Sequence, residues 1–136
     1  MTHVVIVGGG AIGSSIAWWL TREPGMEVTV VERDPTYARA SSALSGSSIR
    51  QQFSTPVNIE IGHFGIGFLR EIGRHLAVDG EAPDIGLMEP GYLFLASEAG
   101  LGILRDNHRI QRRHGADVVL LTPAELRGRF PWLSVE

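Results

Sequence analysis

The sequence predicts an α/β fold that opens with a βαβ unit, the beginning of a doubly wound parallel sheet. Three features of its first third carry this prediction. The apolar run Val4–Val7 is typical of a parallel strand covered on both faces. A glycine-rich turn follows, and then a helical segment whose apolar residues recur at one-, three- and four-residue steps. A second strand, Val28–Glu32, completes the unit.

The turn has the pattern G-x-G-x-x-G, formed by Gly8, Gly10 and Gly13. Gly8 permits a tight exit from the strand, and Gly10 lets a pyrophosphate approach the backbone without meeting a Cβ. Gly13 lets the helix lie close to the strand. The helix begins near Ala11, so the N–H groups of Ala11 and Ile12 would meet the same phosphates at the positive end of the helix dipole.

An acid at the end of the second strand strengthens this interpretation. Glu32 stands nineteen positions after Gly13, where its carboxylate can accept both hydroxyls of an adenosine ribose. The alternative is an ordinary βαβ crossover with a solvated glutamate, which leaves three glycines at the right spacing unexplained. The unit is therefore predicted to bind a dinucleotide.

Composition excludes several other functions. The 136 residues are 43% hydrophobic and 20% charged, with a formal charge of −3, which gives no electrostatic argument for nucleic acid or an anionic membrane surface. The chain has no cysteine and therefore no disulfide, thiolate nucleophile or cysteine-based metal site. No stretch reaches the roughly 20 apolar residues that span a bilayer. A soluble, cytoplasmic protein without a metal site is expected.

A tract of small residues, Ala38–Ser48, follows the second strand and contains five serines. It is either a flexible linker or a loop packed against a bound cofactor, and its position directly after Glu32 favours the second. Arg50 comes next, with a planar guanidinium suited to a carboxylate. From composition alone, a surface arginine paired with a nearby acid is the better interpretation of Arg50.

Beyond Pro56 the pattern turns helical, with an apolar face that continues to about Leu76. Four glycines in this segment predict either tight packing or an irregular helix. Its two histidines, His63 and His75, are expected to be structural or exposed. The remaining expected elements are a strand at Gly91–Ser97, a helix from Glu98 to about His114, a strand at Val118–Leu121 and a short capped helix from Pro123 to about Arg129.

Taken together, these segments resemble the N-terminal portion of the FAD-dependent amine and amino-acid oxidoreductases, the group of D-amino-acid oxidase, glycine oxidase and sarcosine oxidase. The resemblance rests on VVIVGGGAIGSSIAWWL, VTVVERD, ASSALSGSSIRQQFS, PGYLFLAS and LTPAELRGRFPWL. It implies a Rossmann-like FAD-binding unit with its flavin-contacting loop at residues 1–55. Residues 56–136 would then be a helical connection and the start of an incomplete α+β substrate domain.

The resemblance also implies a set of site residues. The three motif glycines would face the FAD pyrophosphate, Glu32 the ribose and Arg33 the adenine. Arg50 would grip the carboxylate of an amine or amino-acid substrate that passes hydride to the flavin. The phosphate and flavin side of the pocket would be lined by Ser41, Ser42, Gly46 and Ser47.

This chain differs from the family in length, because the members of the family are much longer. The strands that complete the sheet come later in those chains, so this chain is expected to be a fragment that does not turn over substrate alone. Uncovered sheet edges and apolar faces predict self-association or a partner chain. Two alternatives stay open: an NAD-dependent dehydrogenase built on the same βαβ unit, and a truncated, non-catalytic nucleotide-binding protein.

Overall fold

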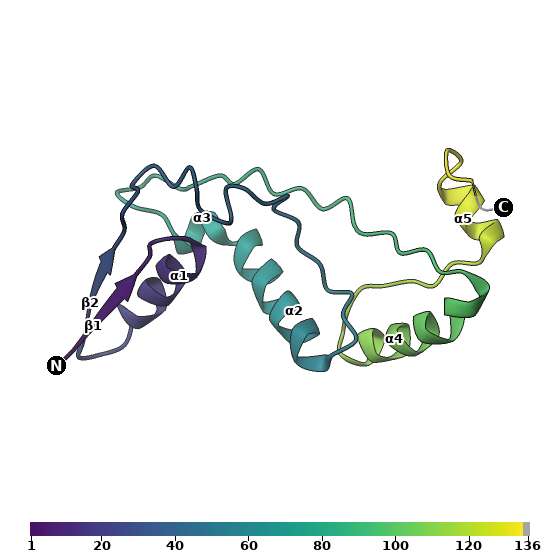
Figure 1. The fold of residues 1–136 in the computed structure, drawn as a ribbon, viewed down its shortest axis with the longest axis horizontal. Coiled ribbons are helices and arrows are strands. Elements are labelled where there is room, and N and C mark those ends of the chain that lie inside the picture. Colours follow the sequence, from purple (N-terminus) through teal and green to yellow (C-terminus); the bar gives the residue numbers. More distant parts are fainter. Residues whose placement is uncertain (135–136) are drawn as a thin grey trace. The chain divides into compact units, whose positions relative to one another are not determined.

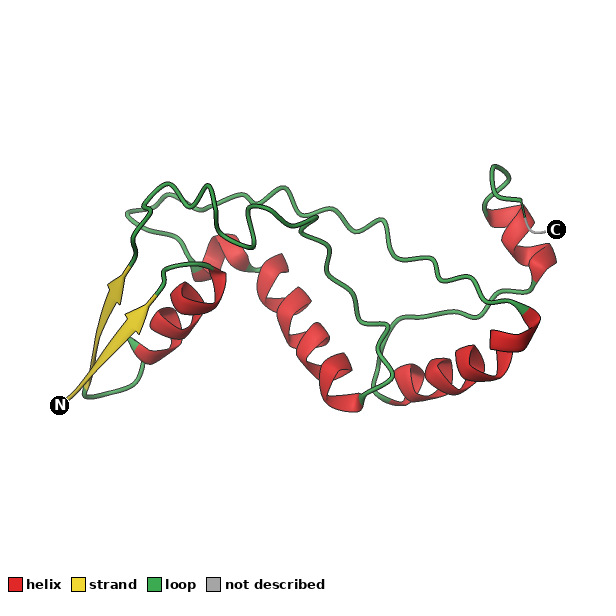
Figure 2. Ribbon diagram, viewed as in Figure 1, coloured by secondary structure: helices red, strands yellow, loops and turns green. Residues whose placement is uncertain are grey.

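The computed structural model describes residues 1–134 and has an α/β fold (Figure 1). The chain forms two compact units, residues 1–48 and 49–136. Figure 2 shows that the strands belong to the first unit and that helices and long loops make up the second. The first unit contains β1 (Thr2–Val7), α1 (Ala11–Leu20) and β2 (Met26–Val31). The second contains α2 (Pro56–Arg70), α3 (Ile72–His75), the 3₁₀ turn η1 (Glu98–Gly100), α4 (Leu101–Arg113) and α5 (Pro123–Arg129).

The predicted βαβ unit is confirmed. Strands β1 and β2 pair in parallel, in register from Thr2 opposite Met26 to Val7 opposite Val31, and α1 connects them. Because side chains alternate along a strand, Val4 and Ile6 share one face with Val28. Ile6 lies against α1, and all three of these side chains are half-buried.

Helix α1 lies very close to the end of β1. A Cβ added to Gly13 would come 1.9 Å from the carbonyl oxygen of Gly8, so only glycine fits there. Gly8 itself has φ +101°, a conformation that L side chains rarely adopt. The two glycines together bring the first turn of α1 directly over the end of the strand.

The opposite face of the sheet is bare. Val5, Val7 and Val31 are 56%, 86% and 52% exposed, so coverage of β1 on both faces is not seen within residues 1–134. Only Gly9 and Gly13 are buried in the first unit. Burial of this face therefore contributes little stability to the unit within the described residues.

The second unit has a small core between α2 and the C-terminal end of α4. Ile59 of α2 and Ala116, which follows α4, are fully buried, and Gln111 of α4 is 8% exposed. His114 Nδ1 lies 3.1 Å from Glu60 Oε1 and ties the two helices at the surface. The expected single helix over residues 56–76 is divided at Glu71, whose backbone leaves the helical region (φ −102°, ψ 13°).

Both strands expected in the second half are wrong. Residues 91–97 and 118–121 are extended loops that pair with no other strand in the described part of the chain. A run of apolar and aromatic residues makes a segment suitable for a sheet, but a strand also needs a neighbour that completes its hydrogen bonds. The short capped helix is confirmed: Thr122 Oγ1 accepts from Glu125 N at 3.3 Å, and Glu125 Oε2 accepts from Thr122 N at 2.7 Å.

None of the helices within residues 1–134 combines the length and apolar character needed to cross a bilayer. The functional boundary proposed between residues 55 and 56 remains a prediction.

Substituting Gly13 tests the close approach of α1 to β1. Gly13→Ala should destabilise the protein by about 1–3 kcal/mol, because the methyl group forces the helix and Gly8 apart. Gly67→Ala in α2, where a Cβ meets nothing within 4 Å, is the control and should be neutral or stabilising. Thermal unfolding followed by circular dichroism measures both, and equal melting temperatures for the two variants would contradict this packing.

Candidate functional site

The glycine turn contains successive backbone N–H groups that have no hydrogen-bond acceptor in the described residues. Gly8 N donates to Val31 O at 2.8 Å and continues the ladder of the sheet, and the first helical bond runs from Ser14 N to Gly10 O at 2.9 Å. Between them, the N–H groups of four successive residues have no acceptor within residues 1–134: Gly10, Ala11, Ile12 and Gly13. The dipole and the free donors of such a helix N-terminus suit an anion.

Glu32 is fixed beside this turn by two main-chain groups. Its Oε1 accepts from Asp34 N at 2.8 Å and its Oε2 accepts from Gly9 N at 2.7 Å. The hydrogen bond from Asp34, then that from Gly9, lower the pKa of the Glu32 carboxyl, and the charge of Arg33 acts in the same direction. Glu32 is therefore an oriented carboxylate at the end of β2, with lone pairs left for further donors.

There is room for a Cβ at Gly10 but not at Gly9. A Cβ on Gly10 would meet no atom within 4 Å, whereas one on Gly9 would come 2.9 Å from the Tyr37 hydroxyl and 3.3 Å from Glu32 Cβ. Sequence reasoning missed Tyr37. Its left-handed backbone (φ +55°) is unusual for a residue other than glycine, but nothing in the sequence signals it.

Arg33 and the predicted residues of the serine tract make no hydrogen bond to the turn within residues 1–134. Arg33 is also exposed. The tract instead bonds internally, with Ser45 Oγ donating to Ser42 O at 2.9 Å and Ser47 N donating to Ser45 Oγ at 3.1 Å. All four predicted tract residues are exposed: Ser41, Ser42, Gly46 and Ser47. The structure thus brings the motif glycines, Ala11, Ile12 and Glu32 together and leaves the tract outside this group.

Arg50 belongs to the second unit and is exposed. Its guanidinium carbon lies 4.8 Å from the ring centroid of Phe53 and 5.6 Å from that of Phe94. The surface ion pair considered for Arg50 is absent, since no acid within residues 1–134 pairs with it. Its guanidinium N–H groups also donate to no acceptor in the described residues.

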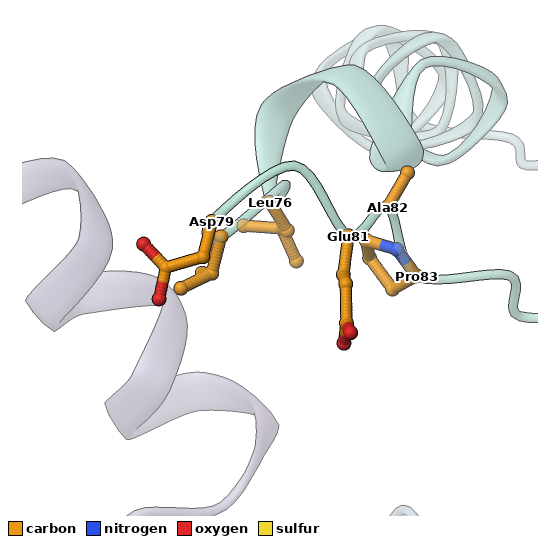
Figure 3. Close-up of a pocket in the computed structure, with 6 residues that line it drawn as sticks. Leu76, Asp79, Glu81, Ala82 and Pro83 are labelled. Carbon is orange, nitrogen blue, oxygen red and sulfur yellow. The ribbon is translucent and has the colours of Figure 1, made fainter.

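A hollow of about 440 Å³ lies elsewhere in the second unit, around the turn at Asp79 and Gly80 (Figure 3). It is lined by Leu76, Val78, Asp79, Glu81, Ala82 and Pro83. In Figure 3 the carboxylates of Asp79 and Glu81 point in different directions. No group of three or more histidines and acids that could hold a metal occurs among the described residues. The hollow contains none of the predicted site residues.

Comparison with known proteins identifies the family. Residues 3–136 match the model of the FAD dependent oxidoreductase family. The chain belongs to this family. It is 52% identical over 136 residues to FAD-dependent oxidoreductase domain-containing protein 1 of Xenopus laevis, covering 96% of this chain and 27% of that protein. The Bos taurus protein of the same name is 49% identical, over 99% of this chain and 29% of the relative.

A more distant relative is the Drosophila melanogaster homolog, which is 40% identical over 99% of this chain and 26% of its own length. The chain therefore spans between a quarter and a third of the length of these relatives. No solved structure matches.

The family is FAD-dependent, so FAD is the cofactor and the NAD alternative is not supported. The residues present fit this cofactor. Four consecutive N–H groups without an acceptor in residues 1–134, together with open space at Gly10, suit a pyrophosphate, and a fixed carboxylate at Glu32 suits a ribose.

Filling the space above Gly10 should block cofactor binding without disturbing the fold. Gly10 has φ −63°, which any residue can adopt, so Gly10→Leu should keep the melting temperature of the flavin-free protein. Its FAD affinity should fall at least about tenfold. Gly102→Leu in α4, another position where a Cβ has open space, is the control. Quenching of flavin fluorescence on titration measures both dissociation constants, and wild-type affinity in Gly10→Leu would exclude this site.

Lowering the pH should reveal how much the hydrogen bonds of Glu32 contribute to the stability of the fold. Its pKa is lowered from 4.5 in the folded protein, so its stabilising bonds are fully present above that value and are lost as pH falls through the lower folded pKa. Glu32→Gln should reduce stability at neutral pH and flatten the decline of melting temperature in acid. Glu27→Gln, at an exposed site on β2, should keep the wild-type profile. A Glu32→Gln profile identical to wild type would show that the two bonds do not stabilise the turn.

Proposed function

We propose that this chain is the N-terminal, FAD-binding part of an enzyme that oxidises an amine or amino acid, of the sarcosine, glycine or D-amino-acid type. The substrate class is proposed from Arg50, whose guanidinium lies near two aromatic rings and donates to no acceptor in the described residues. Arg50 stands at the position where the resemblance implies a residue that binds a carboxylate. An arginine with a solvated face and unpaired N–H donors is suited to bidentate carboxylate binding.

In this proposal the glycine turn holds the cofactor. The N–H groups of Gly10, Ala11, Ile12 and Gly13 bind the pyrophosphate, and Gly8 shapes the turn that presents them. Glu32 accepts the ribose hydroxyls, and its bonds from Gly9 and Asp34 keep it ionised and oriented for that purpose. Arg33 and the serine tract complete the pocket in the proposal, because Arg33 directly follows Glu32 and the tract begins six positions after it.

When bound, FAD supplies an acceptor for the hydride that leaves the carbon next to the substrate nitrogen. Arg50 binds the substrate carboxylate and so fixes which carbon is presented for this transfer. The imine product is then hydrolysed by water. Activity is proposed for the full-length protein, since the chain spans about a quarter of the relatives it matches.

A pair of substrates differing only by a carboxylate tests this function. The full-length protein should reduce its flavin with N-methylglycine and should be at least about tenfold less efficient, in kcat/KM, with dimethylamine. Arg50→Ala should remove that preference by raising KM for N-methylglycine, and Arg50→Lys should restore part of it as a point charge. Anaerobic bleaching of the flavin absorbance provides the measurement.

Two results would count against the proposal. Equal efficiency with both amines in the wild-type protein would remove the carboxylate from the recognition scheme. A protein that binds FAD but is reduced by no amine or amino acid would favour the non-catalytic nucleotide-binding alternative.

A further inference from the structure

We infer that Gly62, Phe53 and Phe94 position the guanidinium of Arg50 to receive a carboxylate. The inference rests on the role proposed for Arg50 and adds three residues that neither the family assignment nor the resemblance provides. All of them belong to the second unit. Gly62 lies against the backbone of Arg50, and Phe53 and Phe94 both lie near its guanidinium.

The backbone of Arg50 is pressed against helix α2 at Gly62. A Cβ on Gly62 would come 2.9 Å from the carbonyl oxygen of Arg50 and 3.5 Å from the Cα of Gln51. Both neighbours are main-chain atoms, so they could not avoid a methyl group by a side-chain rotation. Gly65 and Gly67 in the same helix have open space at the corresponding point. Close approach of residues 50–51 therefore gives a specific reason for glycine at position 62.

The side chain of Arg50 is restricted by two aromatic rings. Its Cζ lies 4.8 Å from the Phe53 centroid and 5.6 Å from the Phe94 centroid, both within the range of a cation–π contact. A cation–π contact attracts the guanidinium to the ring without providing a hydrogen-bond acceptor of the carbonyl or carboxylate kind. The rings therefore limit the motion of the group, and its N–H donors have no such acceptor within the described residues.

The two rings are themselves anchored to their surroundings. Buried Gln111 of α4 donates through Nε2 to Phe53 O at 3.1 Å. Tyr92 stacks on Phe94 with centroids 6.4 Å apart, and Tyr92 O accepts from Gln52 Nε2 at 3.4 Å. Residues 50–53 and 92–94 are thus joined although they are some forty positions apart. The segment around Phe94 forms no strand, and its aromatic residues serve to hold Arg50.

Acetate binding tests the aromatic contacts. In the FAD-loaded full-length protein, the acetate dissociation constant from the flavin absorbance difference should rise two- to fivefold in Phe94→Leu, the worth of an exposed cation–π contact. Phe94→Tyr keeps an aromatic face and should retain wild-type affinity. Phe130→Leu removes the ring that lies 5.8 Å from Arg129 and is the matched control, expected to bind acetate normally.

The backbone contact is tested by a pair of alanine substitutions in one helix. Gly62→Ala should weaken acetate binding several-fold, because residues 50–51 must move by a few tenths of an ångström. Gly67→Ala adds the same methyl group in open space and should leave binding unchanged. Flavin content should be the same in both variants.

The outcomes separate this inference from the proposed function. If Arg50→Ala abolishes acetate binding while Phe94→Leu and Gly62→Ala bind as wild type, the positioning role is wrong and the role of Arg50 stands. If Arg50→Ala binds acetate normally, both are wrong.

An NMR signal gives a readout that needs no ligand. The Arg50 Nε–Hε resonance, assigned by its loss in Arg50→Lys, should be shifted by the ring currents of Phe53 and Phe94. That shift should shrink in Phe94→Leu and persist in Phe130→Leu. An Arg50 resonance that is the same in wild type and Phe94→Leu would overturn the inference.

Discussion

The first unit depends on the contact between Gly13 and the carbonyl oxygen of Gly8. A Cβ would lie 1.9 Å from that oxygen, so the absence of a side chain at one position decides how near α1 comes to β1. This closeness sets the N-terminus of α1 over the end of the strand, where the N–H groups of Gly10 to Gly13 have no partner within residues 1–134. Glu32 then ties Gly9 to the end of β2 and completes the arrangement. A strand, a turn and a helix thereby form a surface whose N–H donors suit an anion.

Local signals predicted most of what the structure shows in the first unit. The apolar run, the spaced glycines and the acid after β2 each act within a few residues of their own position, which is why the βαβ unit could be predicted from them. Tyr37 was missed because its proximity to Gly9 follows from the path of the chain beyond Glu32, where no periodicity exists. For the same reason, the sequence could not determine whether the serine tract reaches the turn.

In the second unit, the sequence pattern predicted less of the structure. Residues 91–97 have the composition of a strand, yet they have no ladder partner within residues 1–134. The glycines of α2 were read as a sign of tight packing or irregularity, and the structure gives a close contact to Gly62 and open space to Gly65 and Gly67. The sheet likewise leaves Val5, Val7 and Val31 exposed on one face. The chain spans about a quarter of the relatives it matches, and apolar surface of this kind is normally covered by further elements.

We propose that the start of α1 binds the pyrophosphate of FAD through the N–H groups that have no acceptor within residues 1–134. This binding can be tested by an NMR titration of the ¹⁵N-labelled, flavin-free full-length protein with ADP, which carries the adenosine and pyrophosphate of FAD. The backbone amide signals of Gly10, Ala11, Ile12 and Gly13 should shift together and saturate with one dissociation constant. Saturable ADP binding that leaves these four amide signals unchanged would contradict it.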